Sequence, residues 1–359
     1  MQKVDRVLPY TSSSFKVQQE QLLKHLSQIG VKLTDIEAER ITCLSRRKYD
    51  HYDHFPPGEN FTVRLIRWLT ENFNKNERND AFSIIKAIKF IDEYELKKLT
   101  TTTFENIQSE VGRENLKIQS KNWYSFIEIW NKKIEEELAK TIFVACADDI
   151  NFDLFRRYAM RTHPNIFKKD NFVEYYKIDQ SSLTDLPENI RIVLLDQISA
   201  SGTTAIRKDN KWAGKIPRFF DIWRDYLKDK KIYYCPYILS QVAQKNLEDR
   251  LLLWRKEEKI SNEIKILQTC NISISPCISD SSGLNIDEKS NVAKLCKKYY
   301  DKFEEDEHTK LVGGVPYGYG RAGLTLVLQS NCPNNTLPIL WHNFNDWYPL
   351  FPRVSHHRR

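Results

Sequence analysis

The chain has 359 residues, of which 41% are hydrophobic and 12% aromatic, so it can bury the core of one large domain or of two ordinary ones. Its formal net charge of +7 is compatible with nucleotide or nucleic-acid partners without requiring either. No stretch approaches the ~20 apolar residues of a membrane span, and the N-terminus lacks the apolar segment of a signal peptide, so we expect a cytoplasmic protein with no membrane partner.

The first 120 residues show helical periodicity alone. Thr34 followed by Glu37 is typical of a capping box at a helix start. One predicted helix carries an apolar face made of Phe61, Leu65, Trp68, Leu69 and Phe73. A later one, leading into the first strand, carries Trp123, Phe126, Ile127, Trp130, Ile134 and Leu138. We therefore predict an all-helical domain over residues 1–120, for packing, partner binding or assembly into a homo-oligomer.

Residues able to bind a metal are few in this part of the chain. His51, Asp53 and His54 lie close together in the polar segment KYDHYDHFPPG, where they either bind a metal or, as we prefer, face solvent. The seven cysteines lack the paired short spacing of a zinc site. We expect them to be reduced thiols, mostly buried.

After residue 140, strands alternate with helices. Apolar runs predict strands at residues 141–146, 173–178, 192–196, 232–239 and 264–269. Helical periodicity predicts helices at residues 152–161 and 241–259. This alternation indicates a mostly parallel sheet, so we predict an α/β domain over residues 121–359. In such sheets ligands bind at the carboxyl ends of the strands.

Residues 192–205, IVLLDQISASGTTA, carry the strongest functional pattern in the chain. An apolar strand ends at Asp196, and a turn of small and hydroxyl residues follows. We expect this turn to open a helix, whose free amides would bind a phosphate, with Gly202 allowing close approach of the backbone. Asp196 would accept hydrogen bonds from sugar hydroxyls or hold magnesium.

This stretch resembles the phosphoribosyl-pyrophosphate signature of type I phosphoribosyltransferases. Asp196 matches the first of two acids, Gln197 replaces the second, and residues 200–204 match the loop. The resemblance implies a type I phosphoribosyltransferase-like fold in which Asp196 and Gln197 hold the ribose hydroxyls or Mg²⁺ at the catalytic centre. The phosphate and ribose would be bound by Ser199, Ala200, Ser201, Gly202, Thr203 and Thr204. An ordinary strand-to-helix turn is the alternative.

The segment after the loop is strongly cationic. Residues 207–218, RKDNKWAGKIPR, contain five cations and a single acid, Asp209. Arg207, Lys208 and Lys215 are our candidates for contact with a departing pyrophosphate. A solvated charged hairpin is the other interpretation.

The C-terminal region contains two further patterns. Three glycines have the spacing G-x-G-x-x-G, but they precede a predicted strand at residues 324–329 and do not open a helix, which argues against a dinucleotide site. Asn334, Asn335 and Trp341 suit recognition of the edge and face of a base. A structural turn with a core tryptophan is equally compatible with this pattern.

With its late PNNTLPILW segment, the chain resembles bacterial phosphoribosyltransferase-like proteins of conflict and antiphage defence systems, over most of its length from about residue 60. Some members lie beside retron reverse transcriptases and are regarded as effectors. The resemblance implies an effector whose ligand is phosphoribosyl pyrophosphate or a nucleotide. Its partners would be a reverse transcriptase and the nucleic acid of that enzyme.

Residues 147–149, after the first strand, differ in type from those usual in active phosphoribosyltransferases. That position usually offers small residues and backbone amides, whereas this chain has Ala147, Asp148 and Asp149. Two carboxylates repel a pyrophosphate. Asp148 is a second candidate magnesium ligand, although we prefer a capping role for these acids.

Three functions remain open from the sequence. The leading hypothesis is an enzyme acting at the anomeric carbon of a ribose 5-phosphate compound, by glycosyl transfer or N-glycosidic cleavage. The rival, favoured by Gln197 and Asp148, is a non-catalytic module that senses a nucleotide and binds a partner. Direct nucleic-acid binding is supported only by the mild basicity.

Overall fold

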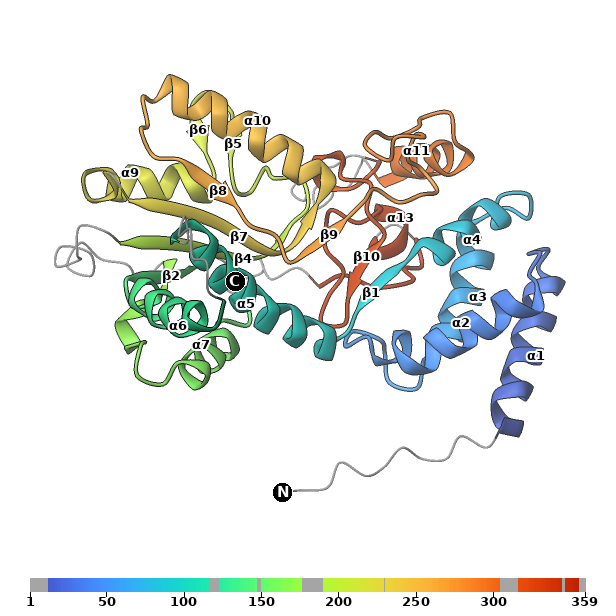
Figure 1. Ribbon diagram of the computed structural model, residues 1–359. Helices are drawn as coiled ribbons and strands as arrows, with labels where there is room; N and C mark the ends of the chain where they lie inside the picture. Colours follow the sequence, from blue (N-terminus) through green and yellow to red (C-terminus); the bar gives the residue numbers. More distant parts are fainter. Residues whose placement is uncertain are drawn as a thin grey trace. The chain divides into compact units, whose positions relative to one another are not determined.

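A computed structural model describes residues 12–115, 123–146, 150–175, 190–228, 230–303, 316–343 and 346–354 (Figure 1). The chain forms two compact units. Unit 1 comprises Met1–Glu93 and Ser275–Arg359, and unit 2 comprises Tyr94–Ile274. Unit 2 is thus an insertion within the sequence of unit 1, and the expected boundary at residue 120 coincides with neither junction.

Unit 1 is mainly helical and contains both ends of the chain. Its helices are α1 (Ser12–Gln28), α2 (Asp35–Arg47), α3 (Phe61–Asn72), α4 (Arg78–Ala87), α11 (Asn291–Phe303) and the short α13 (Pro338–Trp341). Strands β1 (Lys89–Ile91) and β10 (Leu326–Leu328) pair in parallel and join the early and late segments. The strand expected at residues 324–329 is therefore present as β10.

Two helix predictions in unit 1 are confirmed. Thr34 caps α2 in a capping box: its backbone N–H donates to Glu37 Oε2 at 2.9 Å, and the Glu37 N–H donates to Thr34 Oγ1 at 3.3 Å. The apolar stripe of α3 is buried, with Leu65 and Trp68 both 0% exposed. Burial of such a stripe is what stabilises a helix of this length.

Aromatic packing holds the histidine-containing segment at residues 48–58. Tyr49 and Tyr52 are buried, and the Tyr52 hydroxyl donates to Pro352 O at 2.8 Å. Among the described residues, no three His, Cys, Asp or Glu side chains come together as a metal site. The structure assigns none of the seven cysteines to a disulfide, and four of them are buried.

Unit 2 is built on a parallel sheet with strand order β3-β2-β4-β7-β8, and β9 also pairs with β7. The strands are β2 (Thr141–Ala145), β3 (Phe172–Glu174), β4 (Arg191–Ser199), β7 (Lys231–Ser240), β8 (Ile264–Ile266) and β9 (Cys270–Ile272). The α/β class and the mostly parallel sheet are confirmed. Of the run expected at 264–269, only residues 264–266 form a strand, β8, and β9 follows beyond that run. Residues 176–178 of the expected second strand lie outside the described residues.

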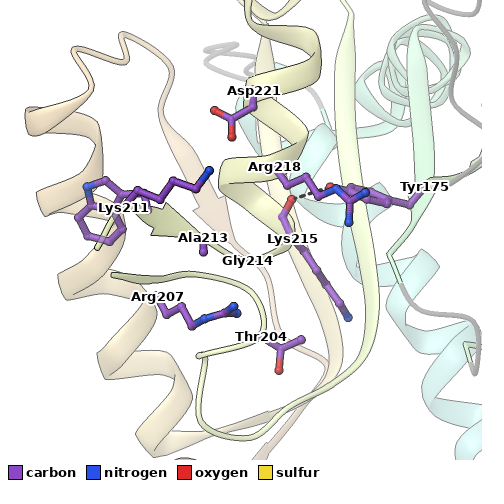
Figure 2. Close-up of a pocket in the computed structure, with 10 residues that line it drawn as sticks. Tyr175, Thr204, Arg207, Lys211, Ala213, Gly214, Lys215, Arg218 and Asp221 are labelled. Atoms are coloured by element: carbon purple, nitrogen blue, oxygen red, sulfur yellow. Dashed lines mark hydrogen bonds between the residues drawn. The ribbon is translucent and has the colours of Figure 1, made fainter. Parts of the chain in front are cut away.

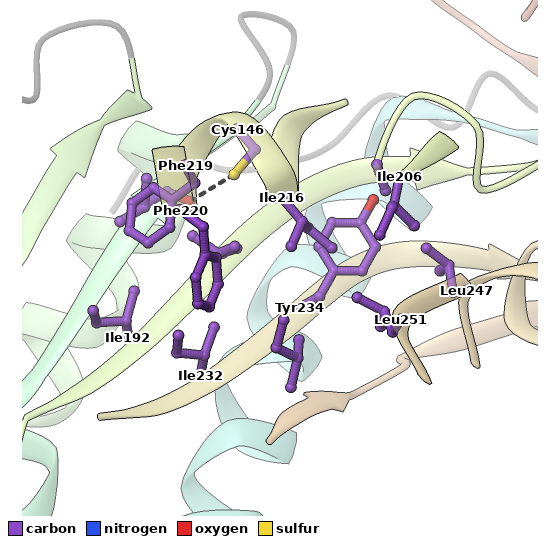
Figure 3. Packing of buried hydrophobic residues seen from close by; sticks show 14 of the residues in the cluster. Cys146, Ile192, Ile206, Ile216, Phe219, Phe220, Ile232, Tyr234, Leu247 and Leu251 are labelled. Atoms are coloured by element: carbon purple, nitrogen blue, oxygen red, sulfur yellow. Dashed lines mark hydrogen bonds between the residues drawn. The ribbon is translucent and has the colours of Figure 1, made fainter. Parts of the chain in front are cut away.

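Helices cover both faces of this sheet (Figure 1). On one face, α9 (Lys215–Leu227) and α10 (Gln241–Glu257) bury a core that includes Ile192, Tyr234, Phe219 and Leu251 (Figure 3). On the other face, Phe143 of β2 packs against Phe104 and Phe155, at ring-centroid distances of 6.3 and 5.0 Å. Those two rings belong to α5 (Glu93–Asn115) and α7 (Phe152–Thr162).

The amphipathic helix predicted before the first strand is α6 (Trp123–Ala139). Ile134 and Leu138 of its apolar face are buried. The side chains of residues 123–130, which include Trp123, Phe126, Ile127 and Trp130, lie outside the described part of the structure. Within the described residues, no helix is both long and apolar enough to span a bilayer.

One element differs from the expectation and bears directly on the site. The loop after β4 does not open a helix. It leads into a small antiparallel hairpin, β5 (Arg207–Lys208) and β6 (Trp212–Ala213), and α9 begins only at Lys215. The hairpin places the cationic segment between the loop and the helix.

Candidate functional site

The loop at residues 200–204 follows the carboxyl end of the central strand β4. This position results from the continuous apolar run of β4, which the sheet buries between its two helical layers. Gly202 has φ = 75°, and a Cβ atom there would lie 3.2 Å from Leu247 Cγ and 3.3 Å from Ala243 O. Close contact with α10 therefore requires a glycine at this position. Close approach of a phosphate, the reason that we expected, stays a prediction.

Hydrogen bonds to other parts of unit 2 use the carbonyl groups of this loop. Ala200 O accepts from the Ser240 hydroxyl, and Ser201 O accepts from Asn246 Nδ2 at 2.9 Å. The carbonyls of Thr204 and Ala205 accept the amides of Lys215 and Ile216, each at 3.0 Å, and so satisfy the first turn of α9. The loop is therefore held in place by hydrogen bonds that its carbonyl oxygens accept.

The amide groups of the loop remain available. Among the described residues, nothing accepts a hydrogen bond from the backbone N–H of Gly202, Thr204 or Ala205. The hydroxyls of Ser201 and Thr203 bond to each other. The Thr203 N–H, by contrast, donates to Ser201 Oγ at 3.4 Å. A loop with three amides that lack protein partners, and with hydroxyls beside them, has donors that an anion requires.

Asp196 is buried at the end of β4 and has three hydrogen-bond partners. Its Oδ2 accepts from Lys215 Nζ at 2.7 Å and from the Tyr234 hydroxyl at 2.8 Å, while Oδ1 accepts from the Gln197 N–H at 3.0 Å. Burial, together with the nearby Asp196 carboxylate, raises the pKa of Tyr234 well above its usual value. The pKa of the Cys146 thiol is raised for the same two reasons. The tyrosine therefore acts as a fixed hydrogen-bond donor to Asp196.

The structure does not bring Asp196 and Gln197 together on one side of the sheet. They are consecutive residues of β4, and consecutive side chains of a strand project from opposite faces. Asp196 is directed to the face covered by α9, where Lys215 and Tyr234 contact it. Both residues are buried.

A pocket of about 530 Å³ opens beside the loop, between the hairpin and the start of α9 (Figure 2). Thr204 lines it from the loop, and Asp221 is the one acid among its lining residues. Its four cations are Arg207, Lys211, Lys215 and Arg218. The pocket therefore has a strong excess of positive charge next to the free amides.

The four cations differ in their partners. Lys215 bonds to Asp196, and Arg207 Nε lies 2.8 Å from Asp209 Oδ2. Lys211 and Arg218 form no ion pair within the described part of the chain. Lys208, expected to contact the leaving group, is not among the lining residues, and its Nζ bonds to Glu257 of α10 at 2.6 Å.

Gly214 and Tyr175 complete the pocket wall. Gly214, at φ = 115°, joins the hairpin to α9, and the Tyr175 hydroxyl donates to Lys215 O at 3.2 Å. Burial raises the pKa of Tyr175 to about 12. Our sequence analysis did not select Tyr175 or Tyr234. Each is a tyrosine in or beside a predicted strand, and only the strand order and register show that they approach the loop.

The predicted base-recognition residues belong to unit 1. The Trp341 Nε1–H donates to Thr336 O at 2.8 Å, and Asn335 Nδ2 donates to Tyr319 O at 2.9 Å. Trp341 is 5% exposed, and the Asn334 carbonyl accepts the Tyr319 amide. These contacts correspond to the structural-turn alternative, and base recognition by these residues stays a prediction.

Near the loop, the described residues include no group of three or more His, Cys, Asp or Glu side chains that could hold a metal ion. Asp196 is the carboxylate at the end of β4, and the Lys215 ammonium already neutralises it. Asp148, the other predicted ligand, lies outside the described residues, as do Ala147 and Asp149. Magnesium binding by Asp196 and Asp148 stays a prediction.

A known protein family matches most of this chain. A protein-family model described as PRTase-CE matches residues 65–353, which include the whole of unit 2 and the segment with Asn334 and Asn335. No curated protein and no solved structure matches the chain.

Proposed function

Since the chain belongs to the PRTase-CE family, a phosphoribosyltransferase-type family, we propose that unit 2 binds a ribose 5-phosphate compound and acts at its anomeric carbon. The ligand would be phosphoribosyl pyrophosphate or a nucleotide. The observation that carries the proposal is the pairing of a loop with free amides and an adjoining pocket that has four cations and one acid.

In this proposal the loop holds the 5′-phosphate. The free amides of Gly202, Thr204 and Ala205 would donate to the phosphate oxygens, and the Thr204 hydroxyl lines the pocket beside them. The loop carbonyls are already bonded within the protein, so the loop would not have to rearrange before it binds. A site organised in advance in this way loses less entropy on binding.

The cations of the pocket would bind the pyrophosphate. Arg207, Lys211 and Arg218 can each donate to its oxygens, and arginine does so through two parallel N–H groups. We assign Lys211 and Arg218 this role in place of Lys208, which Glu257 already neutralises. A base nitrogen or a water oxygen forms the new bond to C1 and loses its proton to solvent. As the bond from C1 to the pyrophosphate oxygen breaks, its electron pair leaves with the pyrophosphate, and the cations stabilise that charge.

Lys215 and Asp196 would act as a coupled pair. Lys215 Nζ lies 2.7 Å from the buried Asp196 carboxylate and neutralises it. A bound pyrophosphate would attract the Lys215 ammonium, which lies at the pocket wall, and Asp196 could then accept hydrogen bonds from the ribose hydroxyls. Magnesium enters the proposal only as a counter-ion carried by the pyrophosphate.

For the biological role we propose a defence effector. An effector of a bacterial antiphage defence system, located in the cytoplasm and partnered by a reverse transcriptase and its nucleic acid, is supported by the resemblance of the PNNTLPILW segment alone. Assembly of the chain into a homo-oligomer is likewise a prediction.

A non-catalytic sensor of nucleotides is the second candidate, and the site geometry favours it in one respect. Asp196 is buried and already paired, and Gln197 projects from the opposite face of β4. The two side chains therefore do not form the pair that would hold both ribose hydroxyls. A sensor would bind through the loop and the cations without breaking a bond.

The test uses the purified chain with magnesium and phosphoribosyl pyrophosphate, nucleotides or NAD, followed by mass spectrometry of free base and pyrophosphate. Arg218→Ala should weaken binding at least about tenfold, since it removes a charge-assisted hydrogen bond. Arg224→Ala, which removes an arginine of the same helix outside the pocket, should leave binding unchanged. Binding without turnover would favour the sensor, and no binding of any of these ligands would contradict both functions.

A further inference from the structure

Unit 2 contains a second cavity that shares no residue with the pocket beside the loop. It is a groove between α5 and α7 with a volume of about 760 Å³, larger than the loop pocket. Its charged residues are Lys97, Lys98 and Glu105 on α5, with Arg157 and Arg161 on α7. We name it the α5–α7 groove.

The spacing of the lining residues shows that two helix faces oppose each other. On α5 they run from Tyr94 to Glu105 in steps of three and four residues, and on α7 from Leu154 to Arg161 in the same way. At 1.5 Å per residue, the stripe on α5 is roughly 17 Å long. Phe104 and Ile107 of α5 are buried, which directs the stripe outward from the core.

Such a stripe normally consists of apolar residues that pack the helices together. Here the two facing stripes together carry four cations and one acid, and the acid is engaged, because Glu105 Oε1 accepts the Tyr158 hydroxyl at 2.6 Å. Arg157 also pairs with Asp153 at 2.5 Å. The groove therefore has an excess of positive charge, although it is not uniformly cationic.

Two tyrosines lie in the groove next to cations. The Tyr94 side chain is 68% exposed, an unusual position for an aromatic ring, and Lys98 Nζ lies 5.7 Å from its centroid. On the facing helix, the Arg161 guanidinium lies 5.7 Å from the Tyr158 ring. Each helix thus presents one ring and a neighbouring cation toward the same cavity.

We infer that the α5–α7 groove binds single-stranded nucleic acid. Lysine and arginine side chains along a groove follow a phosphate backbone, and exposed aromatic rings stack the bases. Stacking on Tyr94 and Tyr158 requires unpaired bases, which favours a single strand over a duplex. An acidic peptide would match the cations but would leave the tyrosine rings without a function.

The binding test uses the full chain and a fluorescently labelled oligothymidylate of about 20 nucleotides, with fluorescence anisotropy measured across a salt series. Lys98→Ala with Arg161→Ala should weaken binding at least about tenfold. It should also lower the slope of log K against log salt by roughly 0.7 for each phosphate that the double variant no longer neutralises. The matched control, Lys245→Ala with Lys256→Ala, removes two exposed cations of α10 and should change binding less than about twofold.

Two single variants test stacking and charge separately. Tyr94→Ser should weaken binding about tenfold, whereas Tyr94→Phe keeps the ring and should bind as the parent chain does. Glu105→Gln removes the acid of the groove while keeping an acceptor for Tyr158, so it should tighten binding. Thermal unfolding of each variant separates loss of binding from loss of fold.

Four outcomes would overturn the inference. They are absence of oligonucleotide binding at low salt, equal weakening in the groove and α10 double variants, and equal competition by duplex DNA or polyglutamate. The fourth is loss of binding in Lys215→Ala with no effect of the groove variants, since the oligonucleotide would then occupy the loop pocket. The first three of these results do not bear on whether the loop binds a ribose 5-phosphate compound.

Discussion

Gly214 has a backbone conformation that other residues rarely adopt. With φ = 115° and ψ = −179°, it lies in a region reached almost only by glycine, and a Cβ atom would lie 2.6 Å from Ala205 O. Gly214→Ala should therefore lower the free energy of unfolding by about 3 kcal/mol or more, through backbone strain and overpacking. The midpoint of urea unfolding, followed by tryptophan fluorescence, measures this decrease.

Gly58 provides the control for that substitution. Its φ is also positive, at 84°, but a Cβ atom there would meet nothing within 4 Å. Gly58→Ala should cost only about 1 kcal/mol, the penalty of a left-handed conformation alone. Equal destabilisation in the two variants would show that the contact with Ala205 has no energetic effect.

At the scale of single residues, local sequence patterns predicted the position of Asp196 and of the loop. They did not predict which distant side chains contact Asp196. Asp196 and the hydroxyl loop could be assigned from an apolar strand followed by small residues. The bond from Lys215 to Asp196 spans 19 positions and depends on the length of the hairpin between them. The Tyr234 contact depends on the register of β4 against β7, which no local pattern specifies.

The capping box of α2 predicts how the stability of the protein depends on pH. The Lys86 side chain, at 2.5 Å, and the Thr34 backbone N–H lower the pKa of Glu37 from 4.5 to about 2. Because the folded-state pKa is depressed, the stability that Glu37 contributes is fully present above about pH 4.5. It is lost as the pH falls toward 2.

Glu37→Gln should remove that dependence. Urea midpoints measured at neutral pH should be lower in the variant than in the parent chain, and the difference should shrink between about pH 4.5 and 2. Glu39→Gln, an exposed position on the same helix, serves as the control. A difference that stays constant over this pH range would rule out the Glu37 carboxylate as the cause.

At the scale of elements, long periodic segments were predictable and short ones were not. The strands around the site are continuous apolar runs, and helices such as α3 and α10 carry clear apolar faces. The hairpin of β5 and β6 consists of two-residue strands, too short for any periodicity. We therefore expected a helix where the chain first forms a hairpin.

At the scale of the whole molecule, the sequence did not show that unit 1 is built from two segments far apart in the chain. Strands β1 and β10 have three residues each, and the bond from Thr325 Oγ1 to Ala87 O joins residues 238 positions apart. No periodic pattern connects segments so distant. The change in sequence pattern near residue 140 lies inside unit 2. It marks the point where the helices α5 and α6 are followed by the first strand of the sheet, β2.

The division into units predicts which fragment folds alone. A fragment of Tyr94–Ile274 contains the complete sheet with helices on both faces, so it should show a cooperative thermal transition by circular dichroism. A fragment of residues 121–359 lacks α5, whose Phe104 covers one face of that sheet, and should be markedly less stable. A cooperative 121–359 fragment and an unfolded 94–274 fragment would contradict this division.

The discontinuity of unit 1 also fixes an order of events during synthesis on the ribosome. Unit 2 is complete once Ile274 has emerged, whereas the first 93 residues must wait for the segment that follows unit 2, because β1 pairs with β10. During that interval the nascent chain carries a finished α/β unit and an unfinished helical one. Any activity of unit 2 that requires unit 1 would therefore begin only after β10 has also been synthesised.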